Sequence, residues 1–376
     1  MKNYDSKFTL PTDNFWPALP DRVVVLENEV KNLSETPSAI ATIGTSLYST
    51  NPLAMPIGPY GTIAFGHNTG SSAQYSNFLG SSSGFLATNA NNSNFLGAST
   101  GTLATNANNS NFLGYIAGYE ATNANDSNFL GSQAGYQATN AYYSNFIGTR
   151  AGQNATNANY SNFIGINAGD GATNAGGSNF IGSTAGIGAI NATYSNFMGV
   201  STGAYASNAG ESIFFGTNAG YSATNANNSN FLGKQAGFSA TSSAYSNFLG
   251  NEAGYGAQSG NSNFLGKRAG FNANNCYASN FLGYLAGEGT SNVYRSNLFG
   301  AEAGMNSTGN NVNAFGYQAH KGGSLSGQTV FANASLPSYT NRSAATTAIT
   351  VPNGAVAGST YLYYNQTTFA IEAVRL

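Results

Sequence analysis

One short phrase, Ser-Asn-Phe-Leu-Gly, returns at a nearly constant interval along most of this chain. The glycine that closes the phrase marks each unit. These glycines are Gly66, Gly80, Gly97, Gly114, Gly131, Gly148, Gly165, Gly182, Gly199, Gly216, Gly233, Gly250, Gly266, Gly283, Gly300 and Gly316. Most intervals between them are 17 residues, two are 16 and the first is 14. A fixed short period repeated this often predicts a solenoid of stacked units rather than a globular domain.

The composition of one unit indicates strands and turns. The full unit is Ser-Asn-Phe-Leu-Gly-x-x-Ala-Gly-x-x-Ala-Thr-Asn-Ala-x-x. Seventeen residues are too few for two helices and a turn, and Asn, Gly, Ser and Thr favour turns over helix interiors. We therefore predict two short strands and two turns per unit. The fold class is all-β, a parallel β-solenoid (β-roll) of about 16 coils, which at ~4.8 Å per coil gives a rod of roughly 75 Å.

The repeated strand is apolar on both faces. Successive side chains on a strand point to opposite sides, so Phe and Leu of the phrase face opposite ways. A strand that is apolar on both faces is buried on both, whereas one solenoid has a single interior. We therefore expect the same row of an identical chain to cover the second face around a symmetry axis. The predicted rows are Phe95, Phe112, Phe129, Phe146, Phe163, Phe180 and Phe197, and Leu96, Leu113, Leu130, Ile147, Ile164 and Ile181. The Phe row is expected to be stacked, buried and directed toward that axis.

The unit resembles a known family of fibre repeats. Ser-Asn-Phe-Leu-Gly-x-x-Ala-Gly-x-x-Ala is similar to the repeat of trimeric autotransporter adhesin heads, and related repeats are found in bacteriophage tail fibres and other virion fibres. The resemblance covers about residues 60–320, and it implies a homotrimer of parallel β-rolls. The later units depart from the adhesin repeat by three inserted residues and by Phe in place of a small residue.

Composition and residue types argue against several functions. Only 7% of residues are charged, the net charge is −2, and no Lys or Arg occurs between Lys31 and Arg150. Such a surface offers no basic track for nucleic acid. The chain has no apolar run of 18 residues, so we expect no membrane insertion. His67 and His320 lie far apart, and His and Cys show no metal-ligand spacing. We therefore expect no enzyme activity, no metal and no cofactor, and we assign no role to Cys276.

The two ends differ from the repeat. Residues 1–37 are predicted to anchor the protein to a partner. They hold a Pro-rich, aromatic leader and then a short coiled-coil seam of Val23, Leu26, Val30 and Leu33, with a surface helix packed on its own chain as the alternative. The start of the chain lacks an apolar signal core, which we take to favour release by lysis over export. Residues 38–60 contain three prolines and are interpreted as a neck, followed by a shaft at 61–320.

Residues 321–376 are predicted to form a small C-terminal β domain that caps the solenoid. They include a strand at 348–351 and a hairpin near the end of the chain. Tyrosine offers an apolar face and a polar tip, which suits the recognition of sugars and proteins alike. The candidate receptor-binding residues are therefore Tyr339, Arg342, Tyr361, Tyr363 and Tyr364, although about half of these tyrosines are equally suited to a core.

Three functions fit these features. The first is a structural and adhesive virion fibre (a bacteriophage tail or head fibre), docked through its N-terminus on another virion protein and touching a host surface glycan or protein with its C-terminus. The second is a bacterial trimeric adhesin head on the cell surface. The third is an ice-binding solenoid, because a row of threonines recurs at constant spacing. That row includes Thr105, Thr122, Thr139, Thr156 and Thr173.

Overall fold

The computed structural model describes residues 62–69, 73–324, 326–331, 360–365 and 370–375. Within these ranges every regular element is a β-strand, and there is no helix. The strands of the repeat region are β1 (Ile63–Phe65), β2 (Asn77–Leu79), β3 (Asn94–Leu96), β4 (Asn111–Leu113), β5 (Asn128–Leu130), β6 (Asn145–Ile147), β7 (Asn162–Ile164), β8 (Asn179–Ile181), β9 (Asn196–Met198), β10 (Ile213–Phe215), β11 (Asn230–Leu232), β12 (Asn247–Leu249), β13 (Asn263–Leu265), β14 (Asn280–Leu282), β15 (Asn297–Phe299), β16 (Asn313–Phe315) and β17 (Thr329–Phe331).

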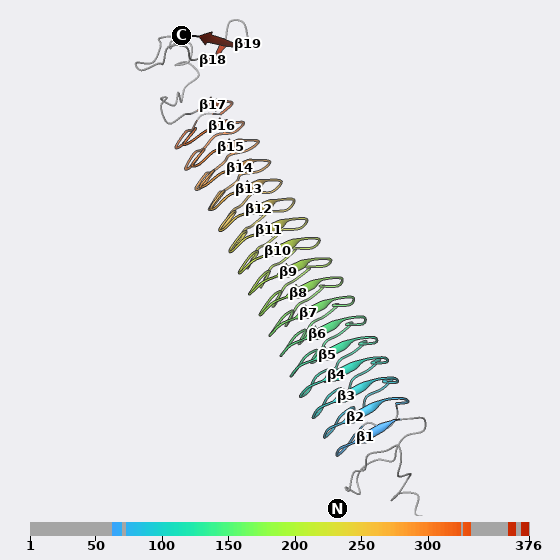
Figure 1. Ribbon diagram of the computed structural model, residues 1–376. Helices are drawn as coiled ribbons and strands as arrows, with labels where there is room; N and C mark the ends of the chain where they lie inside the picture. Colours follow the sequence, from blue (N-terminus) through green and yellow to red (C-terminus); the bar gives the residue numbers. More distant parts are fainter. Residues whose placement is uncertain (1–61, 70–72, 325, 332–359, 366–369, 376) are drawn as a thin grey trace, which may run out of the picture. The chain divides into compact units, whose positions relative to one another are not determined.

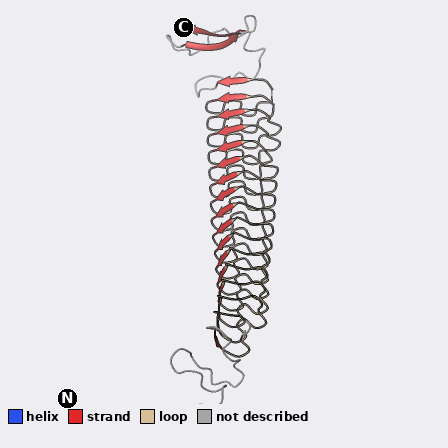
Figure 2. Ribbon diagram, turned by 90° about the vertical axis from the view of Figure 1, so that its right-hand side faces the viewer, coloured by secondary structure: helices blue, strands red, loops and turns tan. Residues whose placement is uncertain are grey.

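These strands form one parallel sheet that runs along the stack of coils (Figures 1 and 2). Each strand pairs with the strand of the next repeat, and equal repeat positions lie opposite one another, as Phe163 of β7 does with Phe180 of β8. The backbone bonds also run between coils, since the N–H of Asn162 donates to the carbonyl of Ser178 at 2.9 Å. The predicted parallel solenoid of about 16 coils is therefore confirmed.

The second strand predicted for each unit is much shorter than expected. It consists of a single bridged residue, and Thr139, for example, forms parallel bridges to Thr122 and Thr156. Gln137 and Asn140, which flank the bridge, have φ angles of 52° and 50°. This left-handed backbone interrupts the extended conformation on both sides of the bridge, so no longer strand can form.

The core of the solenoid is a column of phenylalanine rings. From Phe112 to Phe281 consecutive rings lie 4.6–4.8 Å apart, nearly parallel, and each is fully buried. Buried alanines of the Ala-Gly and Ala-Thr-Asn-Ala segments form the opposite wall. Burying one Phe side chain stabilises the fold by about 1.5–3 kcal/mol, and stacking adds about 0.5–1.5 kcal/mol for each ring pair.

The column corrects one prediction about the Phe row. The rings are stacked and buried as expected, but they point into the coil of their own chain rather than toward a symmetry axis. The reason lies in the alanines across the coil, which leave room for a ring between the two walls. The row that faces outward is the Leu and Ile row, as the partial exposure of Ile164 shows.

Two glycines, present in nearly every unit, make this close packing possible. Gly186 has a φ of 64°, and a Cβ at this position would collide with the ring of Phe180. Gly182 has a φ of 136°, and a Cβ there would collide with the carbonyl of Gly199 in the next coil. Any other residue at either position would therefore be strained and would push a ring or a neighbouring coil away.

The serine of the phrase links neighbouring coils from inside the structure. Ser178 is buried, and its Oγ donates to the carbonyl of Ala192 while it accepts the backbone N–H of Ser195 at 3.0 Å. Equivalent serines from Ser76 to Ser279 make the same bonds. A hydroxyl that donates and accepts in this way meets its bonding requirement without water.

The core changes composition at the C-terminal end of the solenoid. The buried central residue of the strand is Phe281 in β14, Leu298 in β15 and Ala314 in β16. In the coil of Ala314, His320 takes the position that the glycine of the Ala-Gly pair has in other units. Its imidazole is 1% exposed. A Cβ at the equivalent Gly304 would collide with Leu298, so the small Ala314 is the central residue that suits a side chain at the His320 position.

The remaining described residues form a hairpin near the end of the chain. Strands β18 (Thr360–Asn365) and β19 (Ala370–Arg375) pair antiparallel, with Tyr361 opposite Val374 and Tyr364 opposite Ile371. This confirms the hairpin predicted there. The sheet of the solenoid continues to Phe331, one strand beyond the predicted shaft. The coiled-coil seam, the neck at 38–60 and the strand at 348–351 lie outside the described residues.

The first prediction concerns the ring column. Phe180→Ala removes one ring from the middle of the stack, and a Phe-to-Ala change in a core costs about 3–5 kcal/mol. The matched control is Tyr194→Ala, because Tyr194 is 70% exposed and its loss leaves no cavity. Denaturant unfolding followed by circular dichroism measures both variants. Equal midpoints for the two variants would contradict the assignment of the Phe row to the core.

The second prediction concerns pH. Burial is the main influence on His320 and lowers its pKa below the ordinary value, while a weaker backbone interaction at Thr308 acts in the opposite direction. The unfolded segment therefore binds a proton more readily than the folded one. The contribution of neutral, buried His320 to the free energy of unfolding is therefore complete above the unfolded pKa of about 6.5, and it is lost as the pH falls below that value.

Amide hydrogen exchange tests this pH effect. Protection of residues in β16 and β17 should fall between pH 7 and pH 5, after correction for the intrinsic exchange rate, while β7 and β8 remain unchanged. The control is the double variant Ala314→Phe with His320→Gly, which restores the repeat and removes the titrating group. A parent whose C-terminal coils are equally protected at both pH values would show that His320 has no such role.

Candidate interaction surface

The outward face of the sheet carries two parallel rows of side chains. In each strand the central residue points into the core, and the first and third residues point outward. The first residue is Asn in every strand from β2 to β16 except β10, and the third is Leu, Ile, Met or Phe. We call this outward face of β1–β17 the Asn–Leu face.

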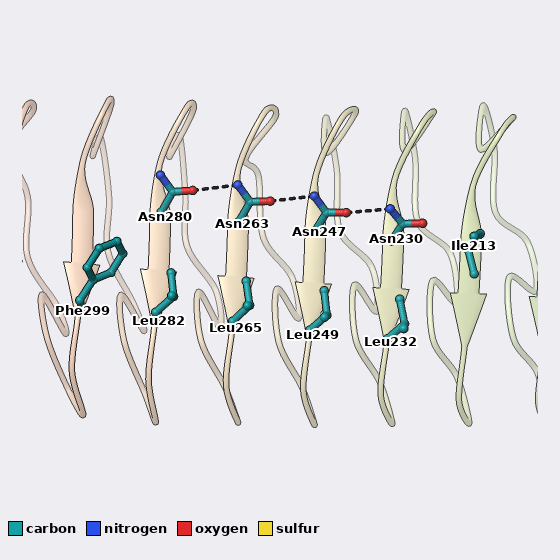
Figure 3. Close-up of a pocket in the computed structure, with 10 residues that line it drawn as sticks. All are labelled: Ile213, Asn230, Leu232, Asn247, Leu249, Asn263, Leu265, Asn280, Leu282 and Phe299. Atoms are coloured by element: carbon teal, nitrogen blue, oxygen red, sulfur yellow. Dashed lines mark hydrogen bonds between the residues drawn. The ribbon is translucent and has the colours of Figure 1, made fainter.

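The asparagines of this face form two hydrogen-bonded ladders. In each, the Nδ2 of one Asn donates to the Oδ1 of the Asn in the next coil, at 2.6–2.8 Å. One ladder runs from Asn77 to Asn196 and the other from Asn230 to Asn313; part of the second is shown in Figure 3. One ladder bond as donor and one as acceptor leave each amide a second N–H and a second lone pair for another partner.

The apolar row beside the ladders is only partly covered by the chain itself. Ile164 and Leu249 are 36% exposed, Met198 is 38% exposed and Phe215 is 53% exposed. The two rows border a shallow groove of about 630 Å³ along β10–β15 (Figure 3). Its lining residues are Ile213, Asn230, Leu232, Asn247, Leu249, Asn263, Leu265, Asn280, Leu282 and Phe299. A second groove of about 400 Å³ borders the same rows along β4–β6.

The Asn–Leu face has no charged side chain. The outward residues of β1–β17 are all amides, apolar residues or, in β17, a threonine. Ion pairs occur on other surfaces, where Arg268 contacts Glu288 at 2.7 Å and Lys321 bonds to Glu302. A long apolar stripe without charge is unusual on the surface of a soluble monomer and is typical of an interaction surface.

The opposite side of the coil is polar. It carries the bridged threonines predicted from the sequence, which are partly exposed, and beside them a third Asn ladder from Asn89 to Asn225. Ile190 interrupts the threonine row, since it takes the bridge position between Thr173 and Ser207. The threonine row is therefore shorter than the Asn–Leu face and is bordered by amides that bond to one another.

A third surface feature is a short aromatic stack at the turn after the Ala-Gly pair. Tyr221, Phe238, Tyr255 and Phe271 stack at 4.9–5.1 Å, and the guanidinium of Arg268 lies 4.3 Å from the centre of the Phe271 ring. The rings cover one another's faces, so their contribution is to bind neighbouring coils together.

Three of the five predicted receptor-binding residues lie in the described structure, on one strand. Tyr361, Tyr363 and Tyr364 lie on β18, where they pair with Val374, Glu372 and Ile371. Tyr339 and Arg342 lie outside the described residues. Whether these five residues form one site stays a prediction.

Sequence reasoning missed how the polar and apolar rows are arranged. The position of the Asn ladders beside the Leu and Ile row, on the same face, was not predicted. The signal was available, because residues two apart on a strand share a face and Asn and Leu are two apart in the phrase. The break in the ladder at Ile213 is likewise visible in the sequence.

The His and Cys side chains, which often form catalytic or metal-binding sites, are far apart or buried in the described part of the fold. Across the described residues no three His, Cys, Asp or Glu side chains gather where they could hold a metal ion. His67 is exposed near the first strand, while His320 is buried in the last coils. Cys276 takes a core alanine position, where burial raises the pKa of its thiol. The described part of the chain contains no helix with the length and hydropathy of a membrane span.

No family model matches this chain, and no curated protein matches its sequence.

The third prediction concerns the amide ladder. Asn162→Ala removes the partner of both Asn145 and Asn179. At about 1 kcal/mol for each lost bond, the free energy of unfolding should fall by about 1–2 kcal/mol. Thr149→Ala is the control, because Thr149 lies in an exposed turn. If denaturant unfolding gives the same midpoint for both variants, the ladder does not stabilise the stack.

Proposed function

We propose that this chain is the shaft-forming subunit of a structural and adhesive virion fibre, such as a bacteriophage tail or head fibre, and that it works as a homotrimer. The N-terminal residues dock on another virion protein, and the C-terminal residues contact a glycan or protein of the host surface. The protein has no catalytic role in this account, and it acts from the virion surface.

The observation that carries this proposal is the unbroken stack of seventeen strands in one register. The units are interchangeable over most of its length, so the repeat region offers extent and stiffness rather than a unique pocket. Seventeen strands at ~4.8 Å give a column of about 77 Å. Fibres that hold an attachment site away from a particle need this combination of length and rigidity.

The Asn–Leu face supports self-association. At about 77 Å by roughly 10 Å, the width of a three-residue strand, it covers on the order of 800 Å². Stable protein interfaces bury about 800 Å² on each partner. The face also repeats at the coil spacing, so a second copy of this chain matches it at every coil. Three parallel copies around one axis can bury their Asn–Leu faces together, in agreement with the resemblance to trimeric β-rolls.

The alternative is a trimeric adhesin head on a bacterial surface. It uses the same shaft and the same self-association, and it differs in what holds the N- and C-terminal segments. An ice-binding role would need a flat threonine row in contact with water. Ile190 and the neighbouring Asn ladder make that row less regular than the Asn–Leu face, which favours the fibre.

The fourth prediction tests the location and the polarity of the fibre. Gold-labelled antibodies against the repeat region should bind particles released by lysis when these are viewed by electron microscopy. A chain that lacks residues 324–376 should still join the particle, provided that it folds, but it should not attach to cells. A chain that lacks residues 1–37 should fold as a rod and fail to join.

Circular dichroism and light scattering on each deletion variant provide the folding control. Gold on the cell envelope instead of on particles would overturn the virion fibre in favour of the surface adhesin. The polarity of the fibre would be the reverse of the proposed one if the chain without residues 1–37 joined particles normally and the chain without residues 324–376 did not.

A further inference from the structure

The Asn–Leu face contains one interior coil that breaks its pattern. In β10, Ile213 replaces the ladder asparagine and Phe215 replaces the smaller apolar residue of most other strands. Ile213 is 44% exposed and Phe215 is 53% exposed, compared with 37% for Leu232 in the next coil. Among the outward side chains of β2–β14, these two are the most exposed apolar ones.

The same coil leaves two amide groups open toward Ile213. All ladder bonds run from Nδ2 to the Oδ1 of the next coil, and Ile213 can neither accept nor donate with its side chain. The first ladder therefore ends with the Nδ2 of Asn196, and the second begins with the Oδ1 of Asn230. At this break an apolar side chain, Ile213, lies between an amide donor without a ladder partner, on Asn196, and an amide acceptor without a ladder partner, on Asn230.

A uniform repeat face cannot by itself fix how copies align. If two identical faces slide by one coil, every Asn still meets an Asn and every Leu meets a Leu, and only the contacts of one terminal coil are lost. Registers of repetitive strands are weakly specified for this reason. In coiled coils a single residue that departs from the pattern selects one alignment. On the Asn–Leu face, β10 is the interior strand that departs from the pattern in this way.

We propose that Ile213 and Phe215 set the register of the assembled copies of this chain. The inference rests on the proposed homotrimer, in which the copies are parallel. In the aligned register the three β10 strands meet, so that Ile213 and Phe215 pack against their own equivalents. A shift by one coil places Ile213 against Asn196 or Asn230 of a neighbouring copy. The open amide is then buried against an apolar side chain, which is unfavourable.

Disulfide trapping in a mixture of two differently tagged variants measures the register. One variant carries Ile164→Cys and the other Ile181→Cys, in a Cys276→Ala background that restores the usual alanine. A disulfide between copies with the same tag is then a same-coil pair, and a disulfide between copies with different tags is an offset pair. Same-coil pairs should exceed offset pairs roughly tenfold, since a buried unpaired amide costs at least about one factor of ten in population.

Two further variants test the role of β10. Ile213→Asn with Phe215→Leu restores the uniform repeat, and it should raise offset pairs to a level comparable with same-coil pairs while the fold is retained. Adding Asn145→Ile with Ile147→Phe moves this break in the pattern to β6, a coil that carries no cysteine, and should restore the excess of same-coil pairs. The matched control adds only the β6 change to the parent, which then keeps its own register.

The outcomes separate the register from the trimer. Trimers that give same-coil and offset pairs in equal amounts in the parent would overturn the register inference and leave the homotrimer standing. The register inference would also be overturned if the variant with Ile213→Asn and Phe215→Leu kept the excess of same-coil pairs. A parent that stays a single chain in light scattering and forms no interchain disulfide would overturn the homotrimer, and the register inference with it.

Discussion

The buried column of phenylalanine rings is the interaction on which the rest of the structure depends. The 4.6–4.8 Å separation of the rings equals the spacing that backbone hydrogen bonds impose between parallel strands. One period therefore satisfies ring stacking, strand pairing, the serine bridges and the asparagine ladders. A change in any one of them is transmitted to the others, because each residue contacts its own equivalents in the coils above and below. This mutual agreement explains how a chain with 7% charged residues and 48 glycines holds one register over seventeen strands.

The column also decides which surface is left for a partner. With the phenylalanine rings inside, the alternation of the strand turns asparagine and the neighbouring Leu, Ile or Met outward. The outward face is apolar, amide-bearing and uncharged along its length, whereas the opposite side of the coil is polar. A face that repeats at the coil spacing is best matched by another face with the same spacing. This geometry supports the proposed self-association of the shaft.

Much of the fold could be predicted from the sequence, because the period of Gly165, Gly182 and Gly199 leaves one coil per repeat as the simplest solution. The direction of the Phe row could not be predicted from alternation alone. Alternation shows that Phe180 and Ile181 face opposite ways, but it does not show which of them lies inside. The alanines across the coil decide this, and their role requires knowledge of how the coil closes. The short bridge at Thr139 was also hidden, since the left-handed backbone at Gln137 and Asn140 is a property of the folded turn. The candidate tyrosines stay unplaced as a site because the repeat says nothing about residues beyond it.

The most direct test of the account is the molar mass in solution of two matched variants, measured by light scattering after size exclusion. Ile164→Asp places a charge on the Asn–Leu face, and Thr156→Asp places the same charge on the opposite side of a coil of the same solenoid. The account predicts that the parent and Thr156→Asp have three times the 38.6 kDa mass of the chain, and that Ile164→Asp is folded but has the mass of one chain. A folded parent with the mass of one chain, or an Ile164→Asp variant that stays trimeric, would contradict the assignment of this face to the interface between copies.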